Sequence, residues 1–395
     1  MTTNRDILVL SAARTAVGTF GGALKDVPLT TLATTAVRAA VERSGVEPAA
    51  VGHLVMGNVI PTDVRDAYLS RVAALEAGLP EETPAMNVNR LCGSGLQAVI
   101  SAAQTLLLGD AEVAIGAGAE SMSRGPYLQQ GQRWGARMGD ATSVDYMLGI
   151  LHDPFHRIHM GITAENVAAR DGITRAMQDE LAAESHRRAA AAIADGRFAG
   201  QIVPVELKTR KGTTVFAIDE HVRPDTRVET LAAMKPAFKE GGTVTAGNAS
   251  GINDGAAAVV LATAEVARRA NARPMARLVA YAHAGVDPKV MGIGPVPASR
   301  AALQRAGLRA HELDVIESNE AFAAQACAVT RALELDPARV NPNGSGISLG
   351  HPVGATGAII VTKALHELQR IGGRYALVTM CIGGGQGIAA IFERA

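Results

Sequence analysis

Ala-Val-Glu-Arg-Ser-Gly-Val, at residues 40–46, is echoed by Ala-Leu-Gln-Arg-Ala-Gly-Leu at residues 302–308. A branched apolar residue follows each copy at the same distance, Val51 in the first and Leu313 in the second. The offset is 262 residues at both points (302 − 40, 313 − 51). Alanine-rich helices that stop at glycine are common, but a constant offset beyond the glycine favours duplication over chance. The sequence therefore predicts two related halves that share a helix, a glycine stop and a strand.

Around these copies, short apolar runs alternate with Ala- and Leu-rich helical stretches. Apolar runs bounded by glycine or polar residues are typical of buried strands, and longer periodic stretches are typical of helices. The predicted strands are 7–11, 54–57, 113–116, 256–262, 315–318 and 375–381. The predicted helices are 29–45, 95–108, 299–307, 321–335 and 354–371. Such alternation predicts an α/β fold with a mainly parallel sheet covered by helices.

The composition changes between the two halves, at residues 121–250. This stretch is richer in Gly, Arg, His and Met, and the alternation of strands and helices fades within it. We interpret it as a loop-rich insertion, the kind of segment that often carries ligand contacts. The predicted domains are an N-terminal α/β half at 1–120, completed by 251–273, an inserted loop domain at 121–250, and a C-terminal α/β half at 274–395.

The composition also restricts the class of partner. Of 395 residues, 48% are apolar, and 38 basic residues balance 38 acidic ones. We therefore expect a large core and no field that would attract nucleic acid or an anionic membrane. Three cysteines without a Cys-x-x-Cys pair favour a reducing cytoplasm over a disulfide framework. The N-terminal apolar run, 7–10, is too short for a secretory signal, and no run approaches the ~20 apolar residues of a membrane span.

Cys92 lies in Asn-Arg-Leu-Cys-Gly-Ser-Gly-Leu, between a strand-like stretch at 85–88 and a helix pattern that begins at about Gly95. At such a junction the unpaired N–H groups and partial positive charge of the helix start favour a thiolate over a thiol. The flanking glycines let a substrate approach the sulfur closely. A lone cysteine is more often a small buried hydrophobe, but this context favours a nucleophile.

His351 lies in Leu-Gly-His-Pro-Val-Gly, within the span 344–357, which contains five glycines and precedes or opens a helix. A thiol is mostly protonated at neutral pH and needs a base such as this imidazole. The alternative is a turn histidine in solvent. Asn319, in Ser-Asn-Glu-Ala-Phe, also lies where a predicted strand meets a helix, and taken alone it would be interpreted as an N-cap.

Cys381 closes an apolar strand and enters Ile-Gly-Gly-Gly-Gln-Gly. A glycine cluster after a strand is typical of a dinucleotide loop, but that fingerprint requires a further helix and strand. Only eight residues follow Gly387, so we reject this interpretation. The cluster instead suits backbone N–H groups turned toward an oxyanion.

Four motifs, in this order and spacing, resemble those of the thiolase family: Cys-Gly-Ser-Gly-Leu, Asn-Glu-Ala-Phe-Ala, Gly-His-Pro and Cys-Ile-Gly-Gly-Gly. The resemblance runs from residue 7 to the last few positions and is greatest to the broader-specificity bacterial β-ketothiolases of polyhydroxyalkanoate synthesis. It implies the thiolase fold, with two duplicated α/β halves packed in layers and an inserted loop domain. It also implies a cytoplasmic homo-oligomer, either a dimer or a dimer-of-dimers tetramer.

The resemblance implies the reaction as well. Two acyl-CoA molecules would condense reversibly, through an acyl-cysteine, to CoA and a 3-ketoacyl-CoA of four or five carbons or somewhat longer. Cys92 would carry the acyl group, His351 would activate it and help to bind the thioester oxygen, and Cys381 would be the acid/base at the α-carbon. Asn319 would hold a water in one oxyanion hole, and N–H groups of Cys92 and Gly383 would form the second. Two holes are reasonable because the tetrahedral adduct and the enolate both need stabilisation.

In this family the insertion binds coenzyme A, which is substrate and product, so neither a cofactor nor a metal is expected. The implied CoA contacts are His159, Met160, Arg223, Ser250, Met291 and Phe322. Arg223 would be the polar anchor, because a guanidinium both pairs and stacks; without the resemblance it would be an ordinary surface arginine. Histidines at 152, 156 and 159 are spaced closely enough for zinc, but Pro154 interrupts the helix that would align them.

One motif departs from the family pattern. Thiolases usually have Asn-Gly-Gly-Ala-Ile-Ala before Leu-Gly-His-Pro, whereas residues 343–348 are Asn-Gly-Ser-Gly-Ile-Ser. The changes are small and leave His351 in place, so they affect details of the turn and not the chemistry. Two other functions remain open. A ketosynthase-like enzyme acting on a carrier protein is disfavoured by the second thiol, Cys381, and a non-catalytic acyl-CoA carrier is disfavoured because every reactive group is present.

Overall fold

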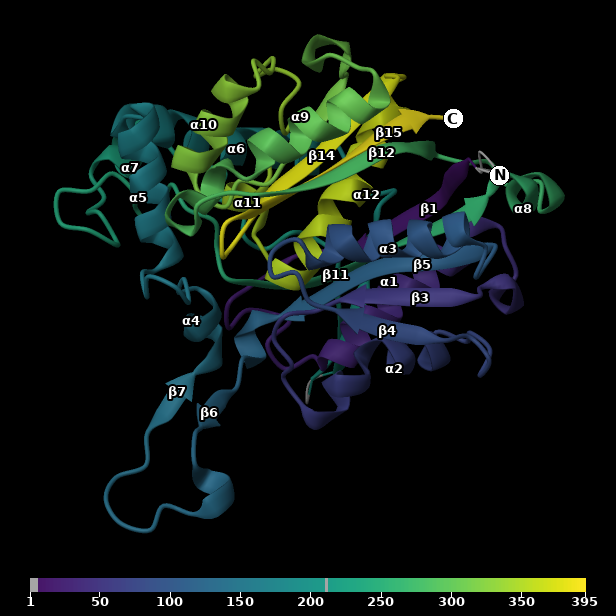
Figure 1. Cartoon of the computed structure of the whole chain (residues 1–395), viewed down its shortest axis with the longest axis horizontal. Helices are drawn as coiled ribbons and strands as arrows, with labels where there is room; N and C mark the ends of the chain where they lie inside the picture. Colours follow the sequence, from purple (N-terminus) through teal and green to yellow (C-terminus); the bar gives the residue numbers. More distant parts are fainter. Residues whose placement is uncertain (1–5, 210–211) are drawn as a thin grey trace.

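The computed structural model describes residues 6–209 and 212–395, in which two groups of strands are stacked with helices between and around them (Figure 1). The first group consists of β1 (Ile7–Thr15), β3 (His53–Gly57), β4 (Ala85–Val88), β5 (Val113–Ser121) and β11 (Asn253–Thr263), in the order β4-β3-β5-β11-β1. The second consists of β12 (Ala276–Gly285), β13 (Val315–Ser318), β14 (Tyr375–Ile382) and β15 (Gln386–Arg394), in the order β12-β15-β14-β13. The groups meet where Leu8 and Val9 of β1 pair with Arg277 and Ala276 of β12.

The helices form three layers around these strands. They are α1 (Leu29–Ser44), α2 (Leu69–Glu76), α3 (Ser94–Leu108), α8 (Ala264–Arg269), α9 (Pro295–Ala306), α10 (Ala323–Ala332), α11 (Gly346–Leu349) and α12 (Val353–Ile371). Helices α3 and α12 lie between the two groups of strands, where α3 packs on β5 and α12 packs on β11 and β14 (Figure 1). Helix α1 covers the outer face of β1 and β11, and α9 covers the outer face of β12 and β15.

The predicted duplication is confirmed. Helices α1 and α9 both end in a glycine in the left-handed region, Gly45 with φ 74° and Gly307 with φ 67°. The following strands β3 and β13 begin at His53 and Val315, and β5 and β14 begin at Val113 and Tyr375. All three pairs are offset by 262 residues (307 − 45, 315 − 53, 375 − 113).

The expectation of a mainly parallel sheet is wrong. Strand β3 is parallel to β4 and β5, and β13 is parallel to β14. From β5 across β11, β1, β12 and β15 to β14, however, every neighbouring pair is antiparallel. Strands β14 and β15 form a hairpin, which makes antiparallel neighbours without a crossover helix. Apolar runs buried on both faces do not reveal strand direction, so the sequence pattern could not separate the two arrangements.

Helices α3 and α12 cross at close range because glycines line their contact. A Cβ on Gly357 would lie 2.1 Å from the backbone nitrogen of Leu96, and one on Gly95 would lie 2.7 Å from that of Ala358. Below the crossing, a Cβ on Gly118 of β5 would lie 2.6 Å from a carbonyl oxygen of α12. Since no side chain fits, the two backbones approach each other near both helix N-termini. The Cys-Gly-Ser-Gly and Gly-His-Pro motifs therefore lie beside each other.

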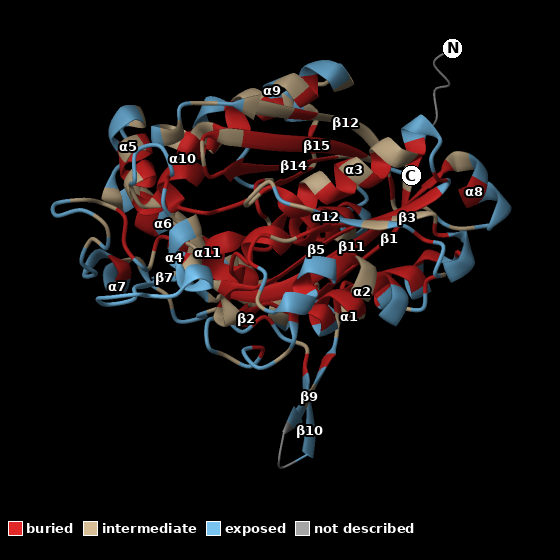
Figure 2. Cartoon of the chain, turned by 60° about the horizontal axis from the view of Figure 1, so that its bottom comes forward, coloured by how far each residue is buried: buried red, intermediate tan, exposed pale blue. Residues whose placement is uncertain are grey.

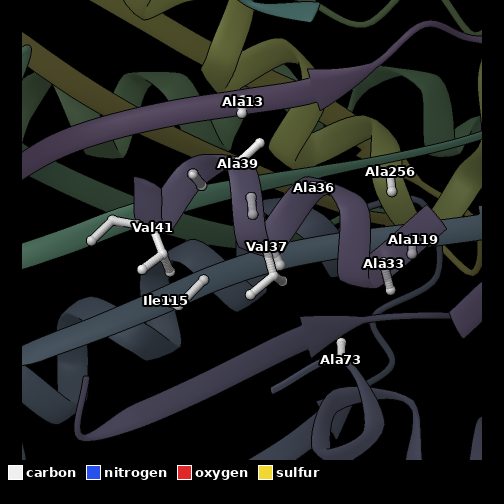
Figure 3. Packing of buried hydrophobic residues seen from close by; sticks show 14 of the residues in the cluster. Ala13, Ala33, Ala36, Val37, Ala39, Val41, Ala73, Ile115, Ala119 and Ala256 are labelled. Carbon is white, nitrogen blue, oxygen red and sulfur yellow. The ribbon is translucent and has the colours of Figure 1, made fainter. Parts of the chain in front are cut away.

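Small apolar residues hold α1 just as closely to the strands. Ala33, Ala36 and Val37 of α1 belong to the same buried cluster as Ile115 and Ala119 of β5, and Figure 3 shows their side chains in the interface. Because alanine and valine are short, the helix axis can lie near the strands without leaving a void. Figure 2 shows β1, β5, β11, β14 and β15 buried along almost their whole length. Strand β12 is only partly buried, and the edge strand β4 has no buried residue.

One segment, Leu91–Leu108, is long and apolar enough to cross a membrane by length and composition alone, with a mean hydropathy of 1.4. It is essentially α3, which packs between the two groups of strands and joins a buried cluster with residues of both. Its apolar character follows from contact on two sides. Ser, Gln and Thr interrupt the apolar run, so its length was not apparent from the sequence.

The insertion contains more regular structure than predicted. Its elements are β6 (Tyr127–Gln129), β7 (Ser143–Asp145), α4 (Tyr146–Ile150), α5 (Met160–Asp171), α6 (Arg175–Ala194), β8 (Ile202–Val203), β9 (Val205–Thr209), β10 (Gly212–Phe216) and α7 (Val228–Ala232). Short β2 (Gly18–Thr19) pairs with β11, and β8 pairs with β1. A fully buried ion pair fastens the insertion to the core, with Arg14 Nη1 2.7 Å from Asp219 Oδ1. Hairpins β6–β7 and β9–β10 project from the body (Figures 1 and 2).

Candidate active site

A pocket of about 500 Å³ lies where the insertion meets both halves. Cys92 from the first half and His351 and Cys381 from the second line it, as does Gly383. The six residues expected to contact CoA line the same pocket: His159, Met160, Arg223, Ser250, Met291 and Phe322. Asn319 lies just behind this wall, with its Nδ2 3.4 Å from His351 Nε2. The structure therefore brings together every residue that the sequence analysis singled out for the site.

A strained turn presents Cys92 to the pocket. Leu91 has a φ of 46°, in the left-handed region that leucine rarely adopts. The Ser94 hydroxyl fixes this turn, because it donates to the Leu91 carbonyl at 2.7 Å and accepts from the Arg90 N–H at 2.8 Å. Backbone strain of this kind is common where a reactive side chain must be aimed.

The expectation that the helix start stabilises a Cys92 thiolate is wrong for the free protein. Burial raises the pKa of Cys92 above the ordinary value of a thiol, and the negative charge of Glu120 adds to this. The N–H groups of Gly383 and of Cys92 itself act in the opposite direction but do not outweigh burial. These two N–H groups thus point to the sulfur, where they can also bind an oxygen on the attached carbon. The resting nucleophile is a thiol that needs a base.

His351 is a neutral base whose tautomer is determined by Thr356. Burial lowers the pKa of His351 to about 4, so the ring is uncharged at neutral pH. Thr356 Oγ1 lies 2.9 Å from the Pro352 carbonyl, to which its single hydrogen is assigned, and 2.7 Å from His351 Nδ1. Nδ1 therefore carries the ring hydrogen and donates it to Thr356. Nε2 keeps its lone pair, toward which the Asn319 amide donates.

Asn319 is not a helix N-cap, since Phe322 occupies that position in α10. Its side chain is fully buried, and its Oδ1 has no hydrogen-bond partner among the described residues. A Cβ on Gly346 would lie 2.8 Å from this oxygen. The glycine at 346, where thiolases usually have alanine, therefore leaves room for Asn319 in this position. The turn that departs from the family pattern therefore packs directly against Asn319.

Cys381 is the residue before the last of β14 and lines the same pocket as Cys92. It is buried, and burial together with the nearby Cys92 raises its pKa strongly, so the resting group is a thiol. The glycines that follow form the β14–β15 turn, in which Gly384 and Gly385 have φ of 80° and 82°. Only glycine adopts this conformation readily. The glycine cluster is therefore a hairpin turn and not a dinucleotide loop. This turn places the Gly383 N–H at the sulfur of Cys92.

An aromatic and thioether wall extends from the thiols toward the surface. The His159 and Phe238 rings stack with centroids 4.7 Å apart, and Phe238 meets Phe322 edge-on at 6.2 Å. Met160 and Met291 are buried beside them. This wall suits an extended ligand that packs aliphatic segments against rings and thioethers. Arg223 is exposed at the mouth.

The three closely spaced histidines each have a separate role. His152 Nδ1 contacts the Leu148 carbonyl at 2.8 Å, and His156 Nδ1 contacts Asp153 at 2.9 Å. His159 Nδ1 accepts from the Gly161 N–H at 3.0 Å and caps α5. The three rings are thus committed to local structure, and His159 alone faces the pocket.

Three residues in or beside the site were not predicted from the sequence. Thr356 follows His351 by five positions, and only the first turn of α12 brings the two together. Phe238 lies in Lys-Pro-Ala-Phe, which carries no motif. Glu120 is the penultimate residue of β5, lies beyond the strand predicted at 113–116 and carries no motif. Only Thr356 could have been found from the sequence. A helix predicted to begin directly after the Gly-His-Pro motif brings residues in its first turn close to His351.

Known proteins resemble this chain along its whole length. Residues 7–265 match the thiolase N-terminal domain, and residues 272–394 match the thiolase C-terminal domain. The chain is 67% identical to Beta-ketothiolase BktB of Cupriavidus necator over 99% of both chains. It is 49% identical to the acetyl-CoA acetyltransferase of the same organism, over 98% of this chain and 99% of that one. The human mitochondrial 3-ketoacyl-CoA thiolase in complex with CoA superposes with a TM-score of 0.96 at 43% identity, covering 99% of this chain and 98% of that one.

The Thr356 contact makes a prediction about turnover. Thr356→Val keeps the shape of the side chain but leaves His351 Nδ1–H without an acceptor. We expect kcat to fall on the order of 10–100-fold, the scale for losing a group that orients a reactive one, with KM for acetoacetyl-CoA little changed. Thr356→Ser retains the hydroxyl and should recover most of kcat. Wild-type turnover in Thr356→Val, or equal losses in both variants, would contradict the tautomer assignment.

Proposed function

The chain belongs to the thiolase family, and we propose that Cys92, His351, Cys381 and Asn319 carry its acyltransferase chemistry. The protein is a β-ketothiolase, which moves acyl groups between CoA and a cysteine and makes or breaks the bond between C2 and C3 of a 3-ketoacyl-CoA. The observation that carries the assignment of roles is the meeting of two thiols, the half-buried Cys92 and the buried Cys381, with a neutral imidazole in one apolar pocket. Each group has the protonation state that its step requires.

Cleavage of a 3-ketoacyl-CoA begins at Cys92. The thiol proton passes to Nε2 of His351, and the sulfur adds to the ketone carbon. The N–H groups of Cys92 and Gly383, which already point to the sulfur, donate to the oxygen that becomes negative in this adduct. Donors fixed before the reaction stabilise such charge without reorganisation.

The carbon–carbon bond then breaks. The departing enolate of acetyl-CoA takes a proton at its α-carbon from Cys381, and the acyl group stays on Cys92. Free CoA next gives its thiol proton to the Cys381 thiolate and attacks the acyl-cysteine. Cys92 leaves as a thiolate and recovers its proton from His351, which restores both groups. Condensation is the same sequence in reverse. A high pKa suits Cys381, because its thiolate must be basic enough to remove a proton next to a thioester.

Binding of CoA follows the aromatic and thioether wall. We assign the pantetheine arm to His159, Met160, Met291 and Phe322, which together form the apolar side of the pocket. Arg223 at the exposed mouth supplies the positive charge for phosphate. The human relative that was crystallised in complex with CoA supports the presence of a CoA site in this chain, to which it is 43% identical.

Labelling tests the two thiol roles. Mixed with acetyl-CoA and digested, the protein should yield an acetylated peptide containing Cys92. Cys381→Ser should still accept acetyl on Cys92, but its condensation rate should fall on the order of 10²–10⁴-fold, the scale for a positioned proton-transfer group. Cys327→Ser is the matched control, since burial raises the pKa of Cys327 to about 12 and its Sγ contacts the Met177 carbonyl. Acetyl found on Cys381 alone would reverse the roles.

The range of chain length follows from the wall around Cys92. Cys92 packs in an apolar cluster with Val59, Met122, Ile150 and Val353, so an added methylene would be buried and stabilised by about 0.8 kcal/mol. We therefore propose products of four and five carbons or somewhat longer. In a pocket that was too tight, the extra methylene would instead disfavour the five-carbon substrate by about 1–3 kcal/mol relative to the four-carbon one.

We expect kcat/KM for 3-ketovaleryl-CoA to lie within about tenfold of that for acetoacetyl-CoA in a thiolysis assay. Val59→Ile adds one methylene to the wall and should reduce the five-carbon value more than the four-carbon one. A preference above roughly 100-fold for acetoacetyl-CoA would disprove the proposed range and leave the reaction itself untouched.

A homo-oligomer, either a dimer or a dimer of dimers, is supported by exposed apolar surface. Met86 lies on the edge strand β4 and is 40% exposed, and edge strands readily pair with a second chain. On the projecting β6–β7 hairpin, Trp134 is 88% and Met138 is 96% exposed, which is costly for a free surface. Light scattering at micromolar protein should return two or four chain masses. Replacing both hairpin residues with serine should leave the dimer and remove the tetramer. A single-chain mass would contradict this proposal.

We also place the enzyme in the cytoplasm. Its three cysteines are free, and two of them are needed as thiols in the proposed reaction. A reducing compartment keeps such thiols from oxidation. In cell fractionation, a tagged chain and its activity should appear in the cytoplasmic fraction. Recovery in another fraction would contradict this proposal.

A further inference from the structure

Glu165, on α5, is a buried carboxylate that bonds to a segment 78 residues further along the chain. Its Oε1 accepts from the backbone N–H groups of Thr243 and Val244, both at 2.8 Å. Its Oε2 accepts from the N–H and the hydroxyl of Thr243, both at 3.0 Å. Among residues 6–209 and 212–395, no lysine, arginine or histidine forms an ion pair with it. The donors that satisfy this buried carboxylate are therefore those of residues 243 and 244.

This segment belongs to a loop at 235–250, which we call the pocket loop. Five of its residues line the active-site pocket: Ala237, Phe238, Ala246, Ala249 and Ser250. The Ala237 N–H donates to the Val244 carbonyl at 2.9 Å, which closes the loop beside Phe238. The Val244 side chain is buried in one cluster with residues of α5. Glu165 therefore holds the backbone that carries Phe238.

Two glycines let the pocket loop lie directly on α5. A Cβ on Gly242 would lie 2.3 Å from Glu165 Oε1, and one on Gly161 would lie 2.3 Å from the ring of Phe238. A side chain at either position would displace the carboxylate or the ring. Because both side chains are absent, the Phe238 ring lies over the first turn of α5 and stacks on His159, with ring centroids 4.7 Å apart. The stack in the pocket wall thus depends on this close approach.

A second set of contacts ties the pocket loop to α6. Asn248 Nδ2 donates to Asp179 Oδ1 at 2.9 Å, and Gln178 Nε2 donates to the Thr243 hydroxyl at 2.9 Å. These contacts do not involve the charge of Glu165, so they keep the loop attached to the body when that charge is removed. Loss of the charge therefore loosens the side of the loop that carries the stacked ring and does not detach the whole loop.

We propose that Glu165 is a positioning residue for the acyl-CoA substrate, because it fixes Phe238 against His159 before the ligand arrives. A loop that is ordered beforehand need not be ordered by the ligand, and this strengthens binding. Glu165 itself does not line the pocket, so it acts on the binding of CoA and its thioesters and not on the chemical steps. The inference rests on the proposed path of CoA along this wall.

The first test measures CoA affinity without turnover. Glu165→Gln retains the shape of the side chain but turns an NH2 group toward N–H donors. The dissociation constant of CoA, measured by calorimetry on the free enzyme, should rise about tenfold, the scale of one strong hydrogen bond. In thiolysis, KM for acetoacetyl-CoA should rise by a similar factor while kcat stays within about twofold. A reduced kcat with an unchanged KM would overturn the proposal.

Glu180→Gln is the matched control, because it makes the same chemical change on α6, where Glu180 lines a separate pocket. Its affinity for CoA should equal that of the wild type. His159→Ala removes one ring of the stack and should weaken CoA binding through the path itself. Unchanged affinity in Glu165→Gln beside weakened binding in His159→Ala would overturn the positioning role and leave the CoA path intact. Unchanged affinity in both variants would overturn both proposals.

Hydrogen exchange, followed by mass spectrometry, tests the positioning directly. In the protein without CoA, the amides of Thr243 and Val244 should exchange faster in Glu165→Gln than in the wild type, while those of α12 should not change. Saturating CoA should restore part of the protection, because the ligand then orders the loop. Equal exchange at these two amides in variant and wild type would contradict the proposal.

A milder variant probes the same contact if Glu165→Gln does not fold. Thr243→Val keeps both backbone N–H bonds to Glu165 and removes only the hydroxyl, so the dissociation constant of CoA should rise about threefold. A wild-type value would overturn the proposal. Where both single variants fold, their combined effect should be smaller than the product of the two, because both changes weaken the same contact. A full product would show that the two residues act independently and would also overturn it.

Discussion

The close crossing of α3 and α12 is the constraint on which the site depends. Gly95 and Gly357 meet the facing backbone at distances that exclude any side chain. They are equivalent positions in the two halves, offset by 262 residues (357 − 95). The same element of the duplicated unit therefore packs against its own counterpart, and the start of each helix is brought to one place. Cys92 and His351 come from different halves and reach a common pocket because these two backbones touch.

Equivalent positions at this crossing have diverged in chemistry. At the same offset, Cys92 corresponds to Gly354, and Ser94 corresponds to Thr356 (354 − 92, 356 − 94). Both hydroxyls sit in the first turn of their helices, where Ser94 holds the turn before the nucleophile and Thr356 holds the base. Where the first half has the side chain of Cys92, the second has Gly354, whose N–H donates to the buried carboxylate of Glu120. One helix start thus presents a nucleophile, and its counterpart presents the support for a base.

Residues recognisable by their neighbours in the chain were predictable, and properties that depend on packing were not. The glycine-rich contexts of Cys92, His351 and Cys381 identified the reactive groups, and the constant offset identified the duplication. The direction of the strands was not predictable, because strands buried on both faces have the same composition in either direction. Neither was the protonation of Cys92, since the helix start was visible in the sequence but the burial that outweighs it was not. Glu120 gave no signal, because its partners lie about 60 and 234 residues away.

The position of β11 has a consequence for biosynthesis. This strand lies between β1 and β5 and is antiparallel to both, yet it is Asn253–Thr263, after the whole insertion. Until the ribosome has made it, the nascent first half has a gap in the middle of its sheet and two apolar strand edges without a neighbour. Contacts that close over so many residues form slowly, and exposed edges invite association with other chains. The buried ion pair between Arg14 and Asp219 also forms late, because Arg14 has no partner until residue 219 has been synthesised. Chain elongation past residue 263 is the event that commits this half to its final form, so pauses in translation before that point lengthen the period in which chaperones must protect it.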